Sequence, residues 1–478
     1  MENSINLPIW LFVLLVVTSL VMILDRLLLP SFRWYLRRRV NRVIDEVNNR
    51  LEIEIRPFQL TKKEALVEQL VYDDKVVQAI KEYAAEHQMP KNLVQAKVLR
   101  YANEIAPSFN AYIYFRFGYW LSKTIGHLLY RVRVGFYDND LLKKIDQNSS
   151  VVFVMNHRSN LDYILVSFLA AEKTALSYAV GEWARIWPLQ ALIKSMGAFF
   201  VRRNSRNVLY RRVLERYVNL ATRAGVCQAV FLEGGLTRDG KLREPKQGFL
   251  DYMLRDYHAE IDRDVVFVPI GINYDRVIED ISLVRKLDSN AQKRSFLFVL
   301  KTTLHFAFKT LFMNRKKRWL RFGYASVNFG KPLAMREYCQ TEGLDFSQLS
   351  QEDRFEQVKK LSIRLMTEVS DVVPVLPVSL MCEVLLAHRS EWLSEFELKS
   401  FAVNRMTELE QLGAPIKIKS NVSEAVLTAA MSMLIGRGFI EKREHDQLIQ
   451  VRSNSLDIIN YYANSIVQWH KDSNFKSD

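Results

Sequence analysis

Short apolar runs alternate with helix-length segments between residues 135 and 332, a pattern typical of an α/β sheet. The predicted strands are Val151–Met155, Ala198–Val201, Ala229–Leu232, Val265–Ile272 and Ala325–Phe329. Apolar runs of this length indicate strands that are buried in a sheet. We therefore predict an α/β domain over residues 141–335, built as a mixed sheet flanked by helices.

The chain on both sides of this domain has the period of helices. Glu64–Tyr72 and Lys75–Glu86 repeat apolar residues at spacings of three and four, and we expect helix from about Val40 to Leu142. Residues 31–140 are therefore predicted to be a basic juxtamembrane and helical region. Residues 336–478 are predicted to be a helical C-terminal region, and the sequence indicates no activity for them.

The N-terminus carries an apolar run that is long enough to span a bilayer. Ile5–Leu24 contains no charged side chain, and about 20 apolar residues suffice for a spanning helix. A cleaved signal peptide normally begins with a basic segment, whereas Met1–Ser4 contains no basic residue. We therefore predict an uncleaved transmembrane anchor at residues 1–30. Arginines crowd the following segment, 26–42, which favours a cytoplasmic location for the body of the chain.

The charge balance points to an anionic partner. The chain has 67 Lys+Arg against 53 Asp+Glu, a net charge of +14, which favours acidic lipid, phosphorylated substrates or nucleic acid. No nucleic-acid recognition motif accompanies the charge, and a basic cluster beside an apolar run is typical of a juxtamembrane segment. A second segment, residues 296–318, combines apolar residues with lysines and arginines. It is either a helix lying in the membrane interface or an internal helix with a polar stripe.

Residues 156–162, Asn-His-Arg-Ser-Asn-Leu-Asp, place an imidazole and a carboxylate five positions apart directly after a predicted strand. On a continuous helix these positions diverge by about 140°, so His157 and Asp162 meet only where the chain turns. A strand-to-helix connection provides that turn, and Ser159 followed by Asp162 is typical of a helix N-terminus. We predict that His157 is a general base oriented by Asp162. The alternative is that Asp162 only caps the helix and His157 is an ordinary loop residue.

Polar residues also follow three other predicted strands. They are Arg202 and Arg203 after Ala198–Val201, Glu233, Gly234, Gly235, Thr237 and Arg238 after Ala229–Leu232, and Asn273 and Tyr274 after Val265–Ile272. Ligands of open α/β sheets collect at the carboxyl ends of the strands. We therefore expect these endings to converge with His157 on one pocket.

A base beside a cationic pocket suits the transfer of an acyl group from a thioester to a hydroxyl of a phosphorylated acceptor. The histidine takes the hydroxyl proton as the oxygen attacks and later protonates the leaving thiolate, so no covalent enzyme intermediate is required. The guanidinium fork of arginine binds phosphate through paired, charge-assisted hydrogen bonds. The candidates are Arg158, Arg202, Arg203 and Arg238, with Lys246 behind them. Each arginine alone is more typical of a surface charge, but the position of several of them directly after predicted strands favours a role in phosphate binding.

Four motifs, in order, resemble those of the glycerophospholipid acyltransferase family. The first, a histidine and an aspartate separated by four residues, matches His157 to Asp162, and the second matches Gly197–Arg203. The third matches Phe231–Gly235, and the fourth matches Pro269. Asn-His-Arg-Ser-Asn-Leu-Asp-Tyr, the double arginine and Glu-Gly-Gly are most similar to the branch that acylates glycerol-3-phosphate or dihydroxyacetone phosphate. The resemblance covers about residues 70–335.

The resemblance implies an α/β acyltransferase domain that transfers a fatty acyl group from acyl-CoA or acyl-carrier-protein to the sn-1 hydroxyl of glycerol-3-phosphate in membrane phospholipid synthesis. It implies no cofactor and no metal, and the chain's three cysteines have no metal-ligand spacing. By the same analogy Glu233, Gly234, Gly235 and Thr237, with the arginines and Pro269, bind the acceptor. The implied partners are membrane lipids, the acyl donor and a phosphorylated glycerol, with no nucleic acid. The implied location is the inner membrane of a bacterium.

One position departs from the family pattern. Leu236 stands where members commonly carry an arginine directly after Glu-Gly-Gly, and Arg238 is the expected substitute. The departure leaves the acceptor open between glycerol-3-phosphate, 1-acylglycerol-3-phosphate and dihydroxyacetone phosphate. A non-enzymatic alternative is an inactive membrane-tethered scaffold that keeps the fold to bind lipid. Retention of both His157 and Asp162 argues against it, because a scaffold needs no base paired with an acid.

Overall fold

The computed structural model describes most of the chain after residue 54. The described residues are 55–136, 142–170, 174–181, 189–202, 205–287, 321–416 and 423–470, with the isolated positions 8, 9, 16, 18, 19 and 418. Apart from those isolated positions, the predicted transmembrane anchor, the arginines of residues 26–42 and the segment 296–318 lie outside the described residues. Within the described part of the chain, no helix combines the length and the apolar character that crossing a bilayer requires.

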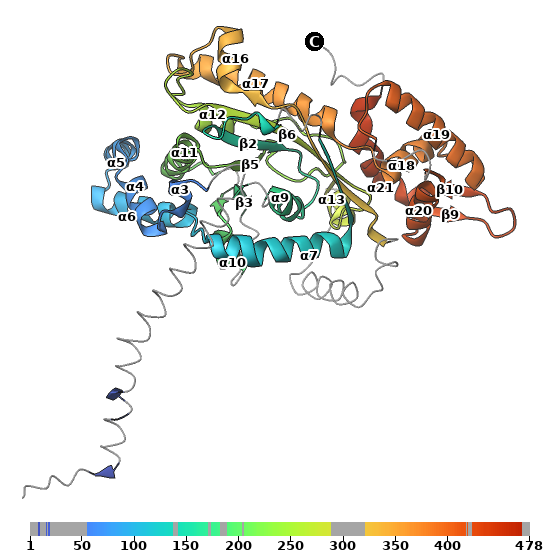
Figure 1. Cartoon of the computed structure of the whole chain (residues 1–478), viewed down its shortest axis with the longest axis horizontal. Coiled ribbons are helices and arrows are strands. Elements are labelled where there is room, and N and C mark those ends of the chain that lie inside the picture. Colours follow the sequence, from blue (N-terminus) through green and yellow to red (C-terminus); the bar gives the residue numbers. More distant parts are fainter. Residues whose placement is uncertain are drawn as a thin grey trace, which may run out of the picture.

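Among the described residues, eight strands form one mixed sheet at the centre of the molecule (Figure 1). They are β1 (Arg131–Phe136), β2 (Ser150–Met155), β3 (Ser177–Gly181), β4 (Ala198–Val201), β5 (Gln228–Phe231), β6 (Val265–Tyr274), β7 (Tyr324–Phe329) and β8 (Leu333–Ala334). Their order is β1-β7-β6-β2-β5-β3-β4, and β8 pairs with β6. β6, β2, β5, β3 and β4 run parallel, whereas β7 and β8 run antiparallel to β6. The predicted mixed sheet is confirmed, and β6, β2, β5, β3 and β4 all end at one edge.

All the predicted strands are present, each within two residues of its predicted bounds. The prediction of helix throughout residues 40–142 is wrong at β1. There, Arg131–Val134 alternates charged and apolar side chains with the period of a strand, and the segment pairs in parallel with β7. The sequence pattern does not indicate β3 and β8, because β8 has only two residues and β3 mixes serine, tyrosine, alanine and glycine.

Helices surround the sheet, and further helices precede and follow the strands along the chain. Before the sheet come α3 (Pro57–Leu60), α4 (Lys63–Val71), α5 (Asp74–Glu86), α6 (Lys91–Ile105), η2 (Ile113–Gly118) and α7 (Tyr119–Leu129). Between the strands lie α9 (Asp162–Ala170), α10 (Leu189–Ser195), α11 (Val208–Arg223), α12 (Gly248–Leu254), α13 (Asp280–Val284) and η4 (Arg285–Leu287). After the sheet follow α16 (Met335–Glu342), α17 (Gln351–Val372), α18 (Pro377–Ala387), α19 (Glu395–Gln411), α20 (Ser423–Gly436), the hairpin of β9 (Ile440–Lys442) and β10 (Ile449–Val451), η6 (Ser453–Ser455), α21 (Leu456–Ala463) and η7 (Asn464–Trp469).

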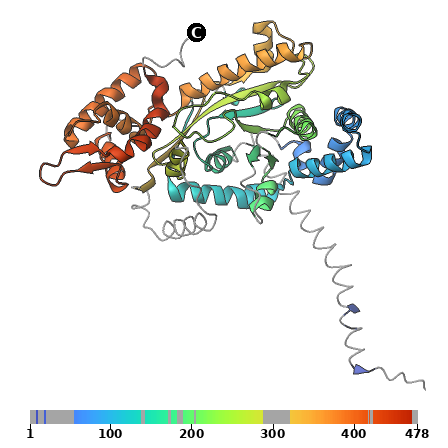
Figure 2. The same cartoon turned by 180° about the vertical axis from the view of Figure 1, so that it is seen from behind.

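Both faces of the sheet are buried, because side chains alternate between two apolar clusters. Val152 and Val154 of β2 belong to the cluster that includes side chains of α6, α11 and α17. Val151 and Phe153 belong to the other cluster, with side chains of α9, α18 and α21. Figure 1 shows α3–α6 gathered at one end of the sheet and α18–α21 at the other, and Figure 2 shows the same arrangement from behind.

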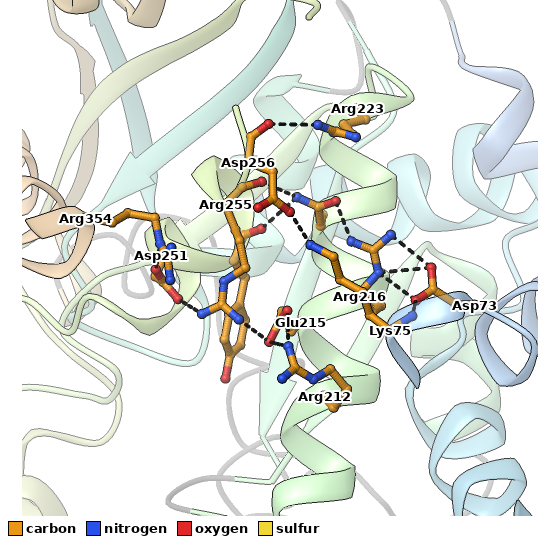
Figure 3. Close-up of polar contacts among 12 residues, drawn as sticks. Asp73, Lys75, Arg212, Glu215, Arg216, Arg223, Asp251, Arg255, Asp256 and Arg354 are labelled. Atoms are coloured by element: carbon orange, nitrogen blue, oxygen red, sulfur yellow. Dashed lines mark hydrogen bonds and ion pairs between the residues drawn. The ribbon is translucent and has the colours of Figure 1, made fainter. Parts of the chain in front are cut away.

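An ion-pair network joins the N-terminal helices to α11, α12 and α17 (Figure 3). Asp73, the N-cap residue of α5, pairs with Arg216 of α11 at 2.9 Å. Asp251 of α12 pairs with Arg354 of α17 at 2.8 Å, and Arg255 also pairs with Asp251. The network therefore connects segments that are far apart in the sequence and that pack on the same face of the sheet.

Candidate active site

His157 and Asp162 lie in the connection between β2 and α9, and their side chains form a hydrogen bond. The distance from Nδ1 of His157 to Oδ2 of Asp162 is 2.9 Å, which confirms the predicted turn that brings them together. The same carboxylate oxygen accepts the backbone N–H groups of Arg158 and Ser159 at 2.8 and 3.0 Å. Asp162 therefore fixes the turn, as the alternative interpretation has it, and it also orients the imidazole.

The second oxygen of Asp162 is held from the neighbouring strand. The hydroxyl of Tyr274, at the end of β6, donates to Oδ1 of Asp162 at 2.7 Å. Burial raises the pKa of Tyr274 well above its ordinary value, so the phenol keeps its proton and acts as a donor. Asp162 is fully buried, and these donors compensate for the loss of water around its charge.

The imidazole of His157 lies in an aromatic enclosure. Its ring stacks on Phe231 of β5 with centroids 4.0 Å apart, and Tyr163 of α9 meets it edge-on at 5.6 Å. With Nδ1 bound to Asp162, Nε2 has no hydrogen-bond partner among the described residues. A histidine held in this way can exchange a proton at Nε2.

Glu233 joins the loops that follow β2 and β5. Its Oε1 accepts the backbone N–H of His157 at 2.7 Å, and its Oε2 accepts that of Arg243 at 3.0 Å. Burial raises its pKa to about 7, against the two backbone donors, which lower it. Glu233 is 1% exposed, and its carboxylate holds the backbone of His157 and of Arg243 in place.

The glycine segment after Glu233 brings a lysine against the backbone. Gly234 has a φ of +66°, and a Cβ at this position would lie 2.7 Å from Cδ of Lys246 and 3.2 Å from its Nζ. The absence of a side chain therefore allows Lys246 to lie directly over the Glu-Gly-Gly turn. No described residue forms an ion pair with this lysine.

Thr237 and Arg238, which follow the turn, have different environments. Thr237 is buried; its hydroxyl donates to the carbonyl of Lys241 at 2.7 Å, and its backbone N–H donates to the carbonyl of His157 at 3.2 Å. Arg238 is exposed, and within the described part of the chain no group forms an ion pair with its guanidinium. Leu236, directly before Thr237, packs against the apolar core that contains β2 and α9. Arg238 is therefore available to a ligand, as are Lys241 and Arg243, which are also exposed and have no ion-pair partner among the described residues.

The other predicted arginines are engaged with protein groups or lie outside the described residues. Arg158 is 2% exposed and donates from Nη1 to the carbonyl of Gly240 at 2.5 Å. Arg202, at the end of β4, forms a paired hydrogen bond with Glu104 of α6 at 2.8 and 2.6 Å. Arg203 lies outside the described residues. The endings of β2, β5 and β6 thus converge, whereas the side chain of Arg202 is directed to α6.

Pro269, matched to the fourth motif, lies within β6 and not at its carboxyl end. It pairs with Val154 of β2, and its carbonyl accepts the N–H of Gly330 at 2.8 Å. On the side of β6 that faces away from β2, the partner strand changes from β8, opposite residues 266 and 267, to β7, opposite residues 270–274. A residue without an N–H group is tolerated at such a change of partner.

Two further residues of the site have no motif in the sequence. One is Tyr274, which donates to Asp162, and the other is Glu279, which accepts the hydroxyl of Ser159 at 2.8 Å and the side-chain amide of Asn160 at 3.0 Å. Glu279 is therefore a second anchor for the start of α9. Only the position of Tyr274 at the end of a predicted strand could have indicated a role.

Comparison with known proteins gives two family models that match successive parts of the chain. The model of the acyltransferase family matches residues 136–273, which contain His157, Asp162 and Glu233. The model of the glycerol-3-phosphate acyltransferase C-terminal region matches residues 308–470. The matched parts thus include most of the sheet and the helices α16–α21.

Curated proteins match the chain at moderate identity. Glycerol-3-phosphate acyltransferase of Ectopseudomonas mendocina is 29% identical over 72% of this chain, and that of Aeromonas hydrophila is 27% identical over 86%. The matched segments make up 40% and 50% of those two proteins, so the chain spans half of their length or less. A solved structure, the 1-acyl-sn-glycerophosphate acyltransferase PlsC from Thermotoga maritima, is 16% identical over 52% of this chain and 77% of its own, with a TM-score of 0.30. That score is too low to support a conclusion about fold or function.

Proposed function

Because the chain belongs to the glycerophospholipid acyltransferase family, in its glycerol-3-phosphate acyltransferase branch, we propose that it transfers a fatty acyl group from an acyl thioester to the sn-1 hydroxyl of glycerol-3-phosphate. The observation that carries the proposal is the 2.9 Å hydrogen bond between Nδ1 of His157 and Asp162 at the carboxyl edge of the sheet. The donor is acyl-CoA or acyl-carrier-protein, and no cofactor or metal takes part.

In the proposed mechanism His157 acts as a general base through Nε2. It removes the proton of the acceptor hydroxyl while the oxygen attacks the thioester carbonyl and the new C–O bond forms. Asp162 stabilises the imidazolium that results and keeps the proton of Nδ1 in place. The C–S bond then breaks, and the thiolate takes the proton from Nε2, so His157 returns to its starting state. Tyr274 supports the step indirectly, by holding Asp162.

The acceptor phosphate in this proposal binds between Arg238 and Lys246. Both are exposed cations with no ion-pair partner among the described residues, and both belong to the segment that follows β5. The Glu-Gly-Gly turn, over which Lys246 lies, provides backbone that a phosphate can approach closely. Arg158 and Arg202, which bind protein groups, act as supports for the site. Glycerol-3-phosphate is preferred to dihydroxyacetone phosphate and 1-acylglycerol-3-phosphate because the curated relatives carry its name.

Membrane association belongs to the proposal as well. The apolar run of residues 5–24 and the arginines of residues 26–42 support an N-terminal anchor with the catalytic body in the cytoplasm, at the bacterial inner membrane. A lipid product that forms at the membrane surface then enters the bilayer directly. A version of the protein without residues 1–30 should still bind anionic vesicles in a salt-sensitive way, because the remaining arginines attract acidic headgroups.

The direct test is an acyl-transfer assay on the purified full chain in detergent or vesicles. Palmitoyl-CoA and palmitoyl-acyl-carrier-protein are offered as donors, each with glycerol-3-phosphate, dihydroxyacetone phosphate or 1-acylglycerol-3-phosphate. We expect turnover with glycerol-3-phosphate and the 1-acyl product. Turnover confined to the lysolipid would contradict the proposed acceptor, and no turnover with any pair would favour the lipid-binding scaffold.

A further inference from the structure

The C-terminal helix α21 and the turn η7 contact the loop that follows the Glu-Gly-Gly turn. The carbonyl oxygen of Tyr461 lies 1.9 Å from the position that a Cβ would take on Gly240, whose φ is +90°. Only glycine fits here, because any side chain would overlap the backbone of α21. Asn464, the first residue of η7, donates from Nδ2 to the carbonyl of Asp239 at 2.8 Å.

Arg158 is enclosed between this loop and α21. Its Nη1 donates to the carbonyl of Gly240 at 2.5 Å, and its guanidinium carbon lies 4.8 Å from the ring centroid of Tyr461. The residue follows His157 directly, and its backbone N–H donates to Asp162. A buried cation that stacks on an aromatic ring from another region fixes the two regions relative to each other. The ring of Tyr461 therefore connects the C-terminal region to the residue that follows His157.

A second contact from α21 reaches the start of α9 from the other side. The hydroxyl of Tyr462 accepts the N–H of Val277 at 3.1 Å and donates to Asp280, which also pairs with Arg437 of the C-terminal region at 2.7 Å. Glu279, the residue before Asp280, holds Ser159 at the start of α9. Adjacent tyrosines of one helix thus hold the two loops that border the candidate site.

We infer that α21 and η7 are a positioning element of the acceptor site, with Tyr461 and Asn464 as its positioning residues. They hold residues 237–241 in the conformation that presents Arg238 to the acceptor phosphate. The inference rests on the proposed function and deepens it, because it gives the C-terminal region a part in acceptor affinity. Neither residue touches the reacting atoms, so their loss affects acceptor binding more than the acyl-transfer step.

The test compares two asparagines of the same segment in the full-length protein. Asn464→Ala removes the hydrogen bond to Asp239, whereas Asn460→Ala changes an exposed asparagine of α21 whose side chain forms no hydrogen bond with a described residue of the loop. We expect Asn464→Ala to raise the KM for glycerol-3-phosphate about fivefold, as for the loss of one neutral hydrogen bond, with the donor KM unchanged. Hydrogen exchange of the backbone amides of residues 237–241 should become faster. Asn460→Ala should leave both quantities at the wild-type value.

The ring of Tyr461 provides a second pair of variants. Tyr461→Leu removes the surface on which Arg158 stacks, and we expect a rise of acceptor KM of about tenfold, with faster exchange of the same loop. Tyr461→Phe keeps the ring and should restore the wild-type values, because the tyrosine hydroxyl has no hydrogen-bond partner among the described residues. Failure of the phenylalanine to restore them would contradict the role of stacking.

The outcomes separate this inference from the proposed function. If the wild type acylates glycerol-3-phosphate but Asn464→Ala changes neither the acceptor KM nor the exchange of residues 237–241, the positioning inference is wrong. A fall of kcat alone, with both KM values unchanged, would indicate a smaller folded fraction and would also overturn it. If the wild type does not acylate glycerol-3-phosphate, the proposed function fails, and the exchange measurement still decides whether α21 and η7 hold the loop.

Discussion

The hydroxyl of Tyr274, at the end of β6, donates a hydrogen bond to Oδ1 of Asp162 at 2.7 Å, while Oδ2 of the same carboxylate lies 2.9 Å from Nδ1 of His157. The three residues come from the carboxyl ends of two neighbouring strands, β6 and β2, and from the first turn of α9. Glu233 adds β5 to the same group through the backbone of His157. The orientation of one imidazole thus depends on three parallel strands that meet at one edge of the sheet.

Loss of the Tyr274 hydroxyl should weaken catalysis without weakening substrate binding. Tyr274→Phe leaves a buried carboxylate oxygen without its donor, and the orientation of His157 becomes less well fixed. We expect kcat to fall about tenfold, with the KM values of both substrates unchanged. Steady-state kinetics with the donor and acceptor varied separately provide the measurement.

The matched control for that variant is Tyr130→Phe. Tyr130 is buried beside Tyr274, with ring centroids 5.3 Å apart, but its hydroxyl donates to the carbonyl of Arg276. We expect this change to leave kcat within about twofold of the wild type. An equal loss in both variants would show that the effect of Tyr274→Phe is one of packing and not of the bond to Asp162.

Loss of Arg238, the exposed arginine of residues 237–241, should weaken the binding of the acceptor and not that of the donor. Arg238→Ala deletes a charge-assisted bond to the acceptor phosphate, and we expect the acceptor KM to rise about tenfold or more. The donor KM should not change. Arg389→Ala, at an exposed arginine after α18, serves as the control for a simple loss of positive charge. Equal increases in both KM values would mean that Arg238 does not bind the phosphate.

The raised pKa of Glu233 makes stability depend on pH. Because its pKa in the folded protein is about 7 against an ordinary value of 4.5, the folded state holds this proton more tightly than the unfolded state does. The stability gained from the neutral acid is complete below about pH 4.5, and it declines as the pH rises to about 7. Relative to Glu233→Gln, the wild type should lose about 3 kcal/mol of unfolding free energy across this interval.

Urea denaturation of both proteins at a series of pH values measures that difference. Other buried carboxyl groups titrate in the same range, such as Asp275 with a pKa raised by burial to about 6, but they are common to both proteins and cancel. A difference between wild type and variant that stays constant, or that grows in favour of the wild type with rising pH, would contradict the proton uptake assigned to Glu233.

The ion-pair network should contribute to stability and not to turnover. Arg354→Ala removes one of the two arginines that pair with the buried Asp251, and we expect a loss of about 2 kcal/mol in unfolding free energy. Arg364→Ala, at an exposed arginine of the same helix, should cost less than about 1 kcal/mol. Both variants should keep the wild-type KM values, and a loss of acceptor affinity in Arg354→Ala would argue against a purely structural role.

The sequence predicts the centre of the molecule well because its strands are continuous apolar runs. β2, β5 and β6 are such runs, and the polar residues that follow β2 and β5 do gather at one edge. The contact of His157 with Asp162 was predictable for the same reason, since a strand-to-helix turn is the arrangement that brings residues five apart together. The roles of both residues in catalysis remain predictions.

The sequence could not predict contacts that depend on distant segments. Arg202 follows a strand as Arg238 follows another, yet it pairs with Glu104, almost a hundred residues earlier. Arg158 belongs to the first motif but stacks on Tyr461, and no local pattern connects residues so far apart. The side chain of each arginine finds its partner through the packing of α6 or α21 on the α/β domain, which only the structure reveals.

His157→Ala tests most directly whether His157 is the base of an acyl transfer to glycerol-3-phosphate. The control is His445→Ala, at a histidine whose side chain is 76% exposed. With the folded fraction of each protein matched by circular dichroism, we expect His157→Ala to lower turnover at least about a hundredfold, and His445→Ala to keep it. More than about a tenth of wild-type turnover in His157→Ala would contradict the assignment of the base.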